Sequence, residues 1–135
     1  MALKGKSKKS KNLMQSFGYA FEGIGYALKT VNNLKIHLLF TLLVIVGGIF
    51  FELSPTEFYV CLIFVALVIS LELINTAIEE VVDLASPEIH PIAKRSKDVA
   101  ASAVLFSAVV SFIVGVSIFL PKIVEFVRSL VWERN

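Results

Sequence analysis

Three long apolar segments constrain the fold of this sequence more than any other feature. They run from about residue 34 to 51, from about 58 to 84 and from about 97 to 119. A bilayer has a hydrocarbon core about 30 Å thick, which about 20 residues of helix cross. Hydrophobic residues make up 56% of the 135 residues and charged residues only 18%, a balance that is unusual for a soluble domain. We therefore predict an all-α membrane protein with three transmembrane helices.

A further helix is predicted before the first span. Between residues 13 and 31, apolar side chains recur at helical spacing and form one stripe, and polar residues occupy the opposite side. A helix with this pattern lies along the membrane surface rather than across it. The expected fold is therefore an N-terminal amphipathic surface helix followed by three transmembrane helices. The apolar stripe consists of Phe17, Ala20, Phe21, Ile24, Ala27, Leu28 and Val31.

The distribution of lysine and arginine predicts the orientation of the chain. Five lysines lie within the first twelve residues, and residues 85–96 form a polar loop that carries further basic residues. Three spans place these two segments on the same side of the membrane, and segments rich in lysine and arginine favour the cytoplasm. We expect a multi-pass protein of the cell membrane with a cytoplasmic N-terminus.

The charge pattern also divides the chain into three expected parts. Residues 1–12 form a basic, disordered arm, for which contact with anionic lipid is a better interpretation than nucleic-acid binding. Residues 13–120 form the membrane domain. Residues 121–135 form an amphipathic tail in which Trp132 suits the membrane interface.

Polar residues interrupt the end of the second span, in the stretch ELINTAIEEVVD. At 100° per residue, one narrow helix face is shared by Glu72, Asn75, Glu79 and Asp83. A carboxylate within hydrocarbon costs at least a few kcal/mol unless it is paired, hydrated or bound to a cation. Acids inside the membrane therefore indicate function. The alternative is that the helix has already left the membrane, which explains Glu80 and Asp83 but explains Glu72 poorly, because its sequence neighbours are apolar.

This face has the residue types needed for phosphoryl transfer. One carboxylate can bind Mg²⁺ through hard oxygen ligands while another accepts a proton from a substrate hydroxyl. Across the predicted loop, Lys97 offers a positive charge suited to a phosphate, and Arg95 offers a second. Magnesium, phosphate and a hydroxyl at the bilayer surface suggest transfer of a phosphoryl group to a lipid.

The stretch ELINTAIEEVVD, followed one loop later by RSKD, resembles the signature of the prokaryotic diacylglycerol kinase family, which includes undecaprenol kinases. The similarity extends over roughly residues 12 to 120 and includes GYAFEG in the surface helix and NLKIH at the first span. The resemblance implies a homotrimer whose active sites are shared between neighbouring subunits at the cytoplasmic interface. It also implies ATP as co-substrate, Mg²⁺ as cofactor and a membrane lipid alcohol as substrate, in recycling of phospholipid or lipid carrier.

Carried over position by position, the resemblance implies a role for each site residue. Glu72 is the general base on the lipid hydroxyl, Asn75 a polar positioning group, and Glu79 a metal ligand. Lys97 holds the ATP phosphates, and Glu88 and His90 lie near the adenine. The full set expected to contact nucleotide or metal is Glu79, Asp83, Glu88, His90, Arg95, Lys97 and Asp98.

The sequence departs from the family pattern at Val31. Members usually have a glutamate two residues before the asparagine of NLKIH, and that glutamate contributes to the metal site. Losing one carboxylate weakens a magnesium site, because hard cations are selected by anionic oxygens. The expected enzyme is therefore an active kinase, with a slow or inactive relative as the alternative.

Two further features bear on the assembly and the substrate. Ala103, Ser107, Ser111 and Gly115 fall at every fourth position of the third span, and such a small-residue stripe lets another helix approach closely, as a trimer requires. His37 is either an interface residue or part of a lipid pocket. Its match to a histidine in undecaprenol-kinase-like members favours undecaprenol over diacylglycerol.

Two other classes of function compete with a lipid kinase. A small proton- or cation-coupled exporter would use Glu72 as its exchange site, but it would not need Lys97 and Asp98 at a helix start. A non-catalytic membrane scaffold would tolerate the loss of any of these side chains.

Overall fold

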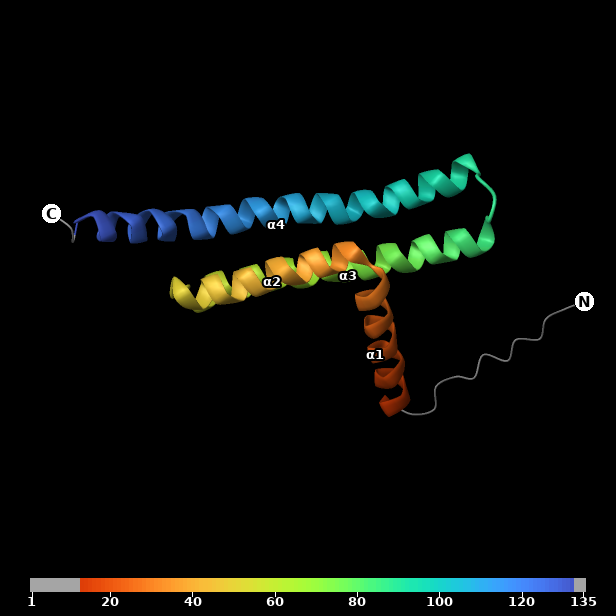
Figure 1. The fold of residues 1–135 in the computed structure, drawn as a ribbon, viewed down its shortest axis with the longest axis horizontal. Helices are drawn as coiled ribbons and strands as arrows, with labels where there is room; N and C mark the ends of the chain where they lie inside the picture. The colour runs from red at the N-terminus through yellow and green to blue at the C-terminus, as the bar shows by residue number, and fades with distance from the viewer. Residues whose placement is uncertain (1–12, 133–135) are drawn as a thin grey trace, which may run out of the picture.

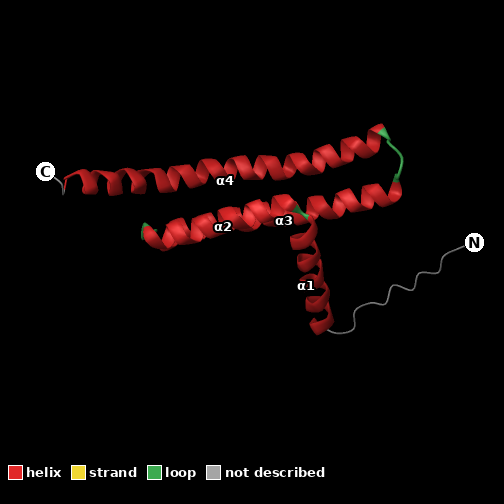
Figure 2. Cartoon of the chain, in the orientation of Figure 1, coloured by secondary structure: helices red, strands yellow, loops and turns green. Residues whose placement is uncertain are grey.

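The computed structural model describes residues 13–132, which contain four α-helices (Figures 1 and 2). They are α1 (Leu13–Thr30), α2 (Asn32–Phe50), α3 (Pro55–Ala85) and α4 (Pro91–Trp132). The last three are long and apolar enough to cross a membrane, so the predicted all-α class with three spans is confirmed. The predicted basic arm at 1–12 and the last three residues of the predicted tail lie outside the described residues.

The three long helices run alongside one another, and α3 packs against both α2 and α4 (Figure 1). α1 stands out sideways from this bundle near the start of α2. Beyond the level of α1, α3 and α4 continue together to the loop that joins them. This projecting hairpin carries the predicted acidic and basic site residues.

The corner between α1 and α2 is a single residue, Val31. Its backbone is extended, with φ −98° and ψ 107°, and its N–H donates to the carbonyl of Ala27 at 2.8 Å. One extended residue between two helices changes the chain direction sharply, because both neighbours keep helical dihedral angles.

The start of α3 lies three residues before the predicted start of the second span. Ser54 and Glu57 form a capping box around Pro55: the Ser54 N–H donates to the Glu57 carboxylate at 2.8 Å, and the Ser54 hydroxyl accepts from the Glu57 N–H at 3.4 Å. This sequence is a strong signal for the start of a helix, because serine caps the first turn, proline suits the first helical position and glutamate completes the capping box.

The predicted polar loop at 85–96 is too long. Only residues 86–90 lie outside the helices, and α4 begins at Pro91. Proline suits the first helical position, because its fixed φ is already helical and no N–H is needed there. Lys97 and Asp98 consequently lie in the second turn of α4 rather than at its first residue. At the other end, α4 passes through Pro121 without a break, so the third span and the described part of the predicted tail are one helix.

The end of the bundle opposite the α3–α4 loop is closed by aromatic and small residues. Phe126 packs edge-on against Phe50 and Phe51, with ring centroids 5.5 and 6.0 Å apart. Gly48 allows α2 to approach α3, because a Cβ at this position would lie 2.8 Å from the ring of Phe58. Most large apolar side chains are exposed on the single chain, as expected of helices that face lipid or other membrane helices.

Candidate active site

The predicted polar face of α3 is partly enclosed. Glu72 is 2% exposed and Asn75 is 7% exposed, although both are polar and lie on an otherwise apolar helix. The Asn75 amide nitrogen donates to Oε1 of Glu79 at 2.9 Å. The other end of that amide, Asn75 Oδ1, is buried with no hydrogen-bond partner among the described residues. A buried oxygen without a partner costs free energy, so this position is suited to a ligand.

The α4 side of the site is tied to α3 by an ion pair. Lys97 Nζ lies 2.8 Å from Oδ1 and 2.9 Å from Oδ2 of Asp83. A second pair lies within α4, where Lys94 Nζ is 2.6 Å from Asp98 Oδ2. The structure therefore brings Lys97 to the acidic face of α3, as a phosphate site there requires. Arg95 is exposed one turn from Asp98.

The register between α2 and α3 indicates how deep in the membrane each site residue lies. Gly48 of α2 lies against Phe58 of α3. Fourteen residues back along α2 is Leu34, and fourteen residues onward along antiparallel α3 is Glu72, so these two are opposite. α2 has 19 residues and is about 28 Å long, close to the thickness of a hydrocarbon core. Glu72 therefore lies at one boundary of that core, and the Asp83–Lys97 pair lies beyond it.

Glu88 and His90 are not gathered with these residues. Both are exposed in the loop between α3 and α4, and their contacts are local. His90 Nδ1 accepts from the Ile92 N–H at 3.2 Å, which satisfies one of the unpaired donors at the start of α4. The Glu88 carbonyl accepts from the Ser86 hydroxyl at 3.1 Å.

The site of a single chain offers only a few oxygen ligands for a hard cation such as Mg²⁺. Within residues 13–132 there is no group of three or more His, Cys, Asp or Glu side chains that could hold a metal ion. Glu79 and the unpartnered Asn75 Oδ1 offer two oxygen ligands on this part of α3. Mg²⁺ is commonly held by one or two carboxylates together with substrate phosphates and water. The donor set therefore fits Mg²⁺ bound with a nucleotide, and Val31 at the helix corner adds no oxygen.

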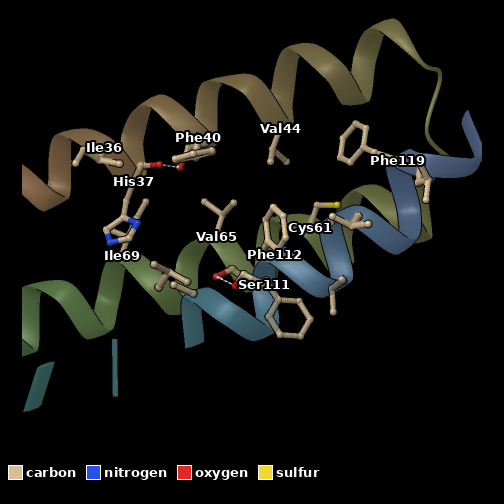
Figure 3. A pocket seen from close by; sticks show the side chains of 18 of the residues that line it. Ile36, His37, Phe40, Val44, Cys61, Val65, Ile69, Ser111, Phe112 and Phe119 are labelled. Atoms are coloured by element: carbon tan, nitrogen blue, oxygen red, sulfur yellow. Dashed lines mark hydrogen bonds between the residues drawn. The ribbon is translucent and has the colours of Figure 1, made fainter. Parts of the chain in front are cut away.

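An apolar groove of about 530 Å³ runs between α2, α3 and α4 (Figure 3). Its few polar side chains include His37, Thr41 and Ser111; the Thr41 and Ser111 hydroxyls point at backbone carbonyls, of His37 at 2.8 Å and of Phe64 at 3.5 Å. The His37 ring lies beside Ile69 at one end of the groove (Figure 3). Ile69 precedes Glu72 by one turn, so this end of the groove adjoins the acidic face.

The small-residue stripe of the third span is used within the chain. Ser107 is 4% exposed, and the Ser111 hydroxyl reaches the Phe64 carbonyl of α3. The chain's own α3 therefore approaches the middle of this stripe, whereas Ala103 is exposed and a Cβ at Gly115 would meet nothing within 4 Å. The homotrimer stays a prediction.

One contact was missed by the sequence analysis. Glu80 is exposed, as a solvated residue would be, but it also acts on α1, because hydrogen bonding to Glu80 and its negative charge raise the pKa of Tyr26. Neither residue stands out in the sequence, because periodicity within one helix does not show which residue of another helix it meets.

The structure has three helices of membrane length, which define an all-helical, multi-pass membrane protein. A polar site lies at one end of its bundle. The site has the buried Glu72 carboxylate at the membrane boundary and the Asp83–Lys97 ion pair beyond it. Sequence comparison narrows this class. A sequence model described as prokaryotic diacylglycerol kinase matches residues 18–119. The chain belongs to this family, as its motifs predicted.

The chain is similar to relatives that are named for two different lipid substrates, undecaprenol and diacylglycerol. It is 42% identical over 109 residues to the undecaprenol kinase of Bacillus subtilis (strain 168), covering 81% of this chain and 89% of that protein. It is 40% identical over 115 residues to a diacylglycerol kinase of Synechocystis sp., covering 84% of this chain and 66% of that protein. A diacylglycerol kinase of Helicobacter pylori (strain J99) is 31% identical over 104 residues, or 77% of this chain and 81% of its own length.

Proposed function

We propose that this protein transfers the γ-phosphoryl group of ATP to the hydroxyl group of a membrane lipid, with undecaprenol as the preferred substrate and diacylglycerol as the alternative. The observation that carries the proposal is the position of Glu72. Its carboxylate is enclosed at the boundary of the hydrocarbon core, where the hydroxyl of a lipid alcohol also lies. Membership of the family and the names of the relatives support the same reaction.

In this proposal Glu72 is the general base. The lipid oxygen attacks the γ-phosphorus, the bond from that phosphorus to the β–γ bridging oxygen breaks, and ADP leaves. The proton of the lipid hydroxyl passes to the Glu72 carboxylate. A positioned base contributes about 10²- to 10⁴-fold to a reaction of this kind. The amide nitrogen of Asn75 positions Glu79, to whose carboxylate it donates a hydrogen bond at 2.9 Å.

The nucleotide is placed on the aqueous side of Glu72. Glu79 and Asn75 Oδ1 would hold Mg²⁺, which neutralises charge on the transferred phosphate when it is bound. Lys97 contacts the phosphates, and Asp83 holds its ammonium group on the correct side of α4 through the observed pair. Arg95 and Asp98 contribute to the same nucleotide site. The assignment of Glu88 and His90 to the adenine rests on the family resemblance.

The apolar groove is the place we propose for the hydrocarbon chain of the lipid. It is lined by three helices and adjoins Glu72 at the end marked by His37 and Ile69. A volume of about 530 Å³ is in the range of sites that bind small apolar ligands. Undecaprenol is preferred because of His37 and because the relative named undecaprenol kinase is 42% identical.

The membrane arrangement is part of the proposal. α1 lies on the cytoplasmic surface of the cell membrane, with exposed apolar residues such as Phe17 and Phe21 in contact with lipid. The N-terminus and the α3–α4 loop face the cytoplasm. The active unit is a homotrimer, built from the domain at 13–120, with the basic arm and the C-terminal tail outside it.

Val31 favours a second possibility, a kinase with reduced activity. The residue is partly buried at the α1–α2 corner, and its side chain offers no oxygen to a cation near Glu79. A magnesium site with fewer anionic ligands binds its ion more weakly. Under this possibility the reaction is unchanged and its magnesium requirement is higher.

The proposal is tested with purified, detergent-solubilised protein, ATP and Mg²⁺. Undecaprenol and diacylglycerol are supplied side by side, and the products are separated by thin-layer chromatography. We expect a phosphorylated product that depends on ATP, with a higher kcat/KM for undecaprenol. An absence of product from both lipids, at magnesium concentrations up to tens of millimolar, would show that the proposed activity is wrong.

A further inference from the structure

The groove proposed for the lipid tail has a defined outer end, away from the acidic face of α3. Its lining residues end at Val44 on α2 and at Cys61 on α3, whereas on α4 they continue to Ile123. The part of the groove that has all three helices as walls therefore ends about one turn of α2 before Gly47. Ten residues of α2 separate His37, at the inner end, from Gly47, which corresponds to about 15 Å of helix.

At this outer end, the ring of Phe119 crosses from α4 to α2. A Cβ at Gly47 would lie 3.1 Å from Cε1 of Phe119, so the ring lies directly on the backbone of Gly47. Phe51 is edge-on to Phe119, with ring centroids 6.3 Å apart, and it packs in turn against Phe126 at 6.0 Å. Figure 3 shows Phe119 and His37 at opposite ends of the lining side chains. Phe119 therefore forms a wall across the outer end of the groove, with further aromatic rings behind it.

The polar groups along the groove favour a tail that has no polar atoms. The hydroxyls of Thr41 and Ser111 are directed at backbone carbonyls, so they do not offer a donor to a ligand. His37 lies at the inner end, near the proposed position of the lipid hydroxyl. Diacylglycerol brings two tails and two ester carbonyls, and a buried carbonyl without a donor costs free energy. A polyprenol brings one tail of carbon and hydrogen, which fits this lining better.

We propose that Phe119 is a specificity-determining residue, whose ring on Gly47 is the end wall that sets how much of a polyprenol tail the groove holds. The proposal deepens the proposed lipid kinase function and rests on it. A longer tail leaves the groove before Phe119 and continues in the surrounding lipid. Because the tail comes from hydrocarbon and returns to it, the groove contributes only packing contacts, and prenyl units beyond the wall add none.

The first test compares the phosphorylation of prenols of increasing chain length by the purified protein, with ATP and Mg²⁺ in one detergent. We expect kcat/KM to rise with each added prenyl unit and to level off at the length that fills the groove. Phe119→Ala removes the wall and leaves a cavity, so the levelling-off length should increase by about one prenyl unit or more. Phe119→Trp should decrease it, because the larger ring occupies part of the groove.

Two further variants accompany this test. Phe106→Ala is the matched control, because Phe106 is an exposed phenylalanine of the same helix that does not line the groove, and the levelling-off length should stay unchanged. Phe119→Leu is a smaller truncation, and it should change the length in the same direction as Phe119→Ala if the alanine variant does not fold.

The second test measures binding without catalysis. Prenols with a photoreactive diazirine at the far end of the tail are bound without ATP and irradiated, and mass spectrometry identifies the labelled peptides. Prenols that fit the groove should label the peptides that contain Val44 and Cys61 in both wild-type protein and Phe119→Ala. A prenol about one unit too long should label the peptide that contains Phe51 only in Phe119→Ala.

The two readouts separate the wall from the proposed function. If no prenol is phosphorylated while the labelled peptide still changes with the side chain at position 119, the function is wrong and the wall stands. If prenols are phosphorylated with the same length dependence in wild-type protein and in every Phe119 variant, the wall is wrong and the function stands. Labels that never reach the groove, as when a helix of a second copy of the chain fills it, also overturn the wall.

Discussion

At the scale of single residues, the site is defined by buried polar side chains. An apolar residue at the same positions would be buried without loss of hydrogen bonds to water. Glu72 and Asn75 are both buried, and Asn75 keeps one oxygen without a partner in the described structure. Such groups destabilise a fold unless a ligand completes them. Helical periodicity predicted that these residues share a face, because their spacing alone fixes their angles about α3. It could not predict that Glu72 is almost completely buried, which depends on how the other helices pack against α3.

The missing carboxylate at Val31 can be restored. Val31→Glu places an anionic oxygen at the corner between α1 and α2, and we expect the magnesium concentration for half-maximal activity to fall about tenfold, because hard cations prefer anionic oxygens. Val31→Gln is the control, since it adds a neutral oxygen of similar reach. A magnesium dependence that is identical in all three proteins would remove Val31 from the metal site.

Lys97 is predicted to act on the nucleotide and not on the lipid. Lys97→Met keeps the length of the side chain and removes the charge, and we expect the KM for ATP to rise about tenfold or more, as for loss of a charged hydrogen bond. The KM for the lipid should stay within about twofold. Lys122→Met, at the opposite end of the bundle, is the control. A rise in the lipid KM alone would contradict the assignment.

At the scale of elements, the ends of the helices were harder to predict than their existence. The apolar runs are long enough to identify α2, α3 and α4, because crossing a bilayer needs a minimum length. The start of α4 at Pro91 was missed, since proline was interpreted as a loop residue although it also begins helices. Pro121 was interpreted as a boundary for the same reason, and α4 passes through it.

The close approach of α2 to α3 depends on Gly48. A Cβ at this position would lie 2.8 Å from the Phe58 ring and 3.0 Å from Leu53 Cδ1. We expect Gly48→Ala to lower the free energy of unfolding by about 1–3 kcal/mol, the usual range for overpacking. Gly23→Ala is the control, because a Cβ at Gly23 meets nothing within 4 Å. Thermal unfolding in detergent measures both, and equal stability of the two variants would contradict the packing.

At the scale of the whole molecule, the depth of each element follows from one membrane position. If α2 crosses the hydrocarbon core, then Glu72 lies at one boundary, and the Asp83–Lys97 pair lies in water on the same side. The Glu57–Lys122 pair, 3.9 Å apart, then lies at the other boundary. Charge and length in the sequence predicted the three spans and the polar end of the second. They did not predict the two ion pairs or the groove between α2 and α4, because these depend on how the helices pack on α3.

This position makes a prediction about topology. Single cysteines at Ser86 and Ser129, in a Cys61→Ala background, should lie on opposite sides of the membrane. We expect a membrane-impermeant thiol reagent added to intact cells to label the cysteine at 129 and to leave the one at 86 unlabelled, since the α3–α4 loop is proposed to be cytoplasmic. The reverse labelling pattern would invert the orientation.

The central claim is that Glu72 accepts the proton of a lipid hydroxyl during phosphoryl transfer. Its most direct test compares wild-type protein with Glu72→Gln in the same lipid vesicles, with Mg²⁺ and radiolabelled ATP, by counting phosphate transferred to undecaprenol. Glu125→Gln, an exposed glutamate on α4, controls for loss of a carboxylate. We predict that Glu72→Gln lowers kcat by about 10²-fold or more while the KM for ATP changes little. A kcat within about threefold of wild type would contradict the account.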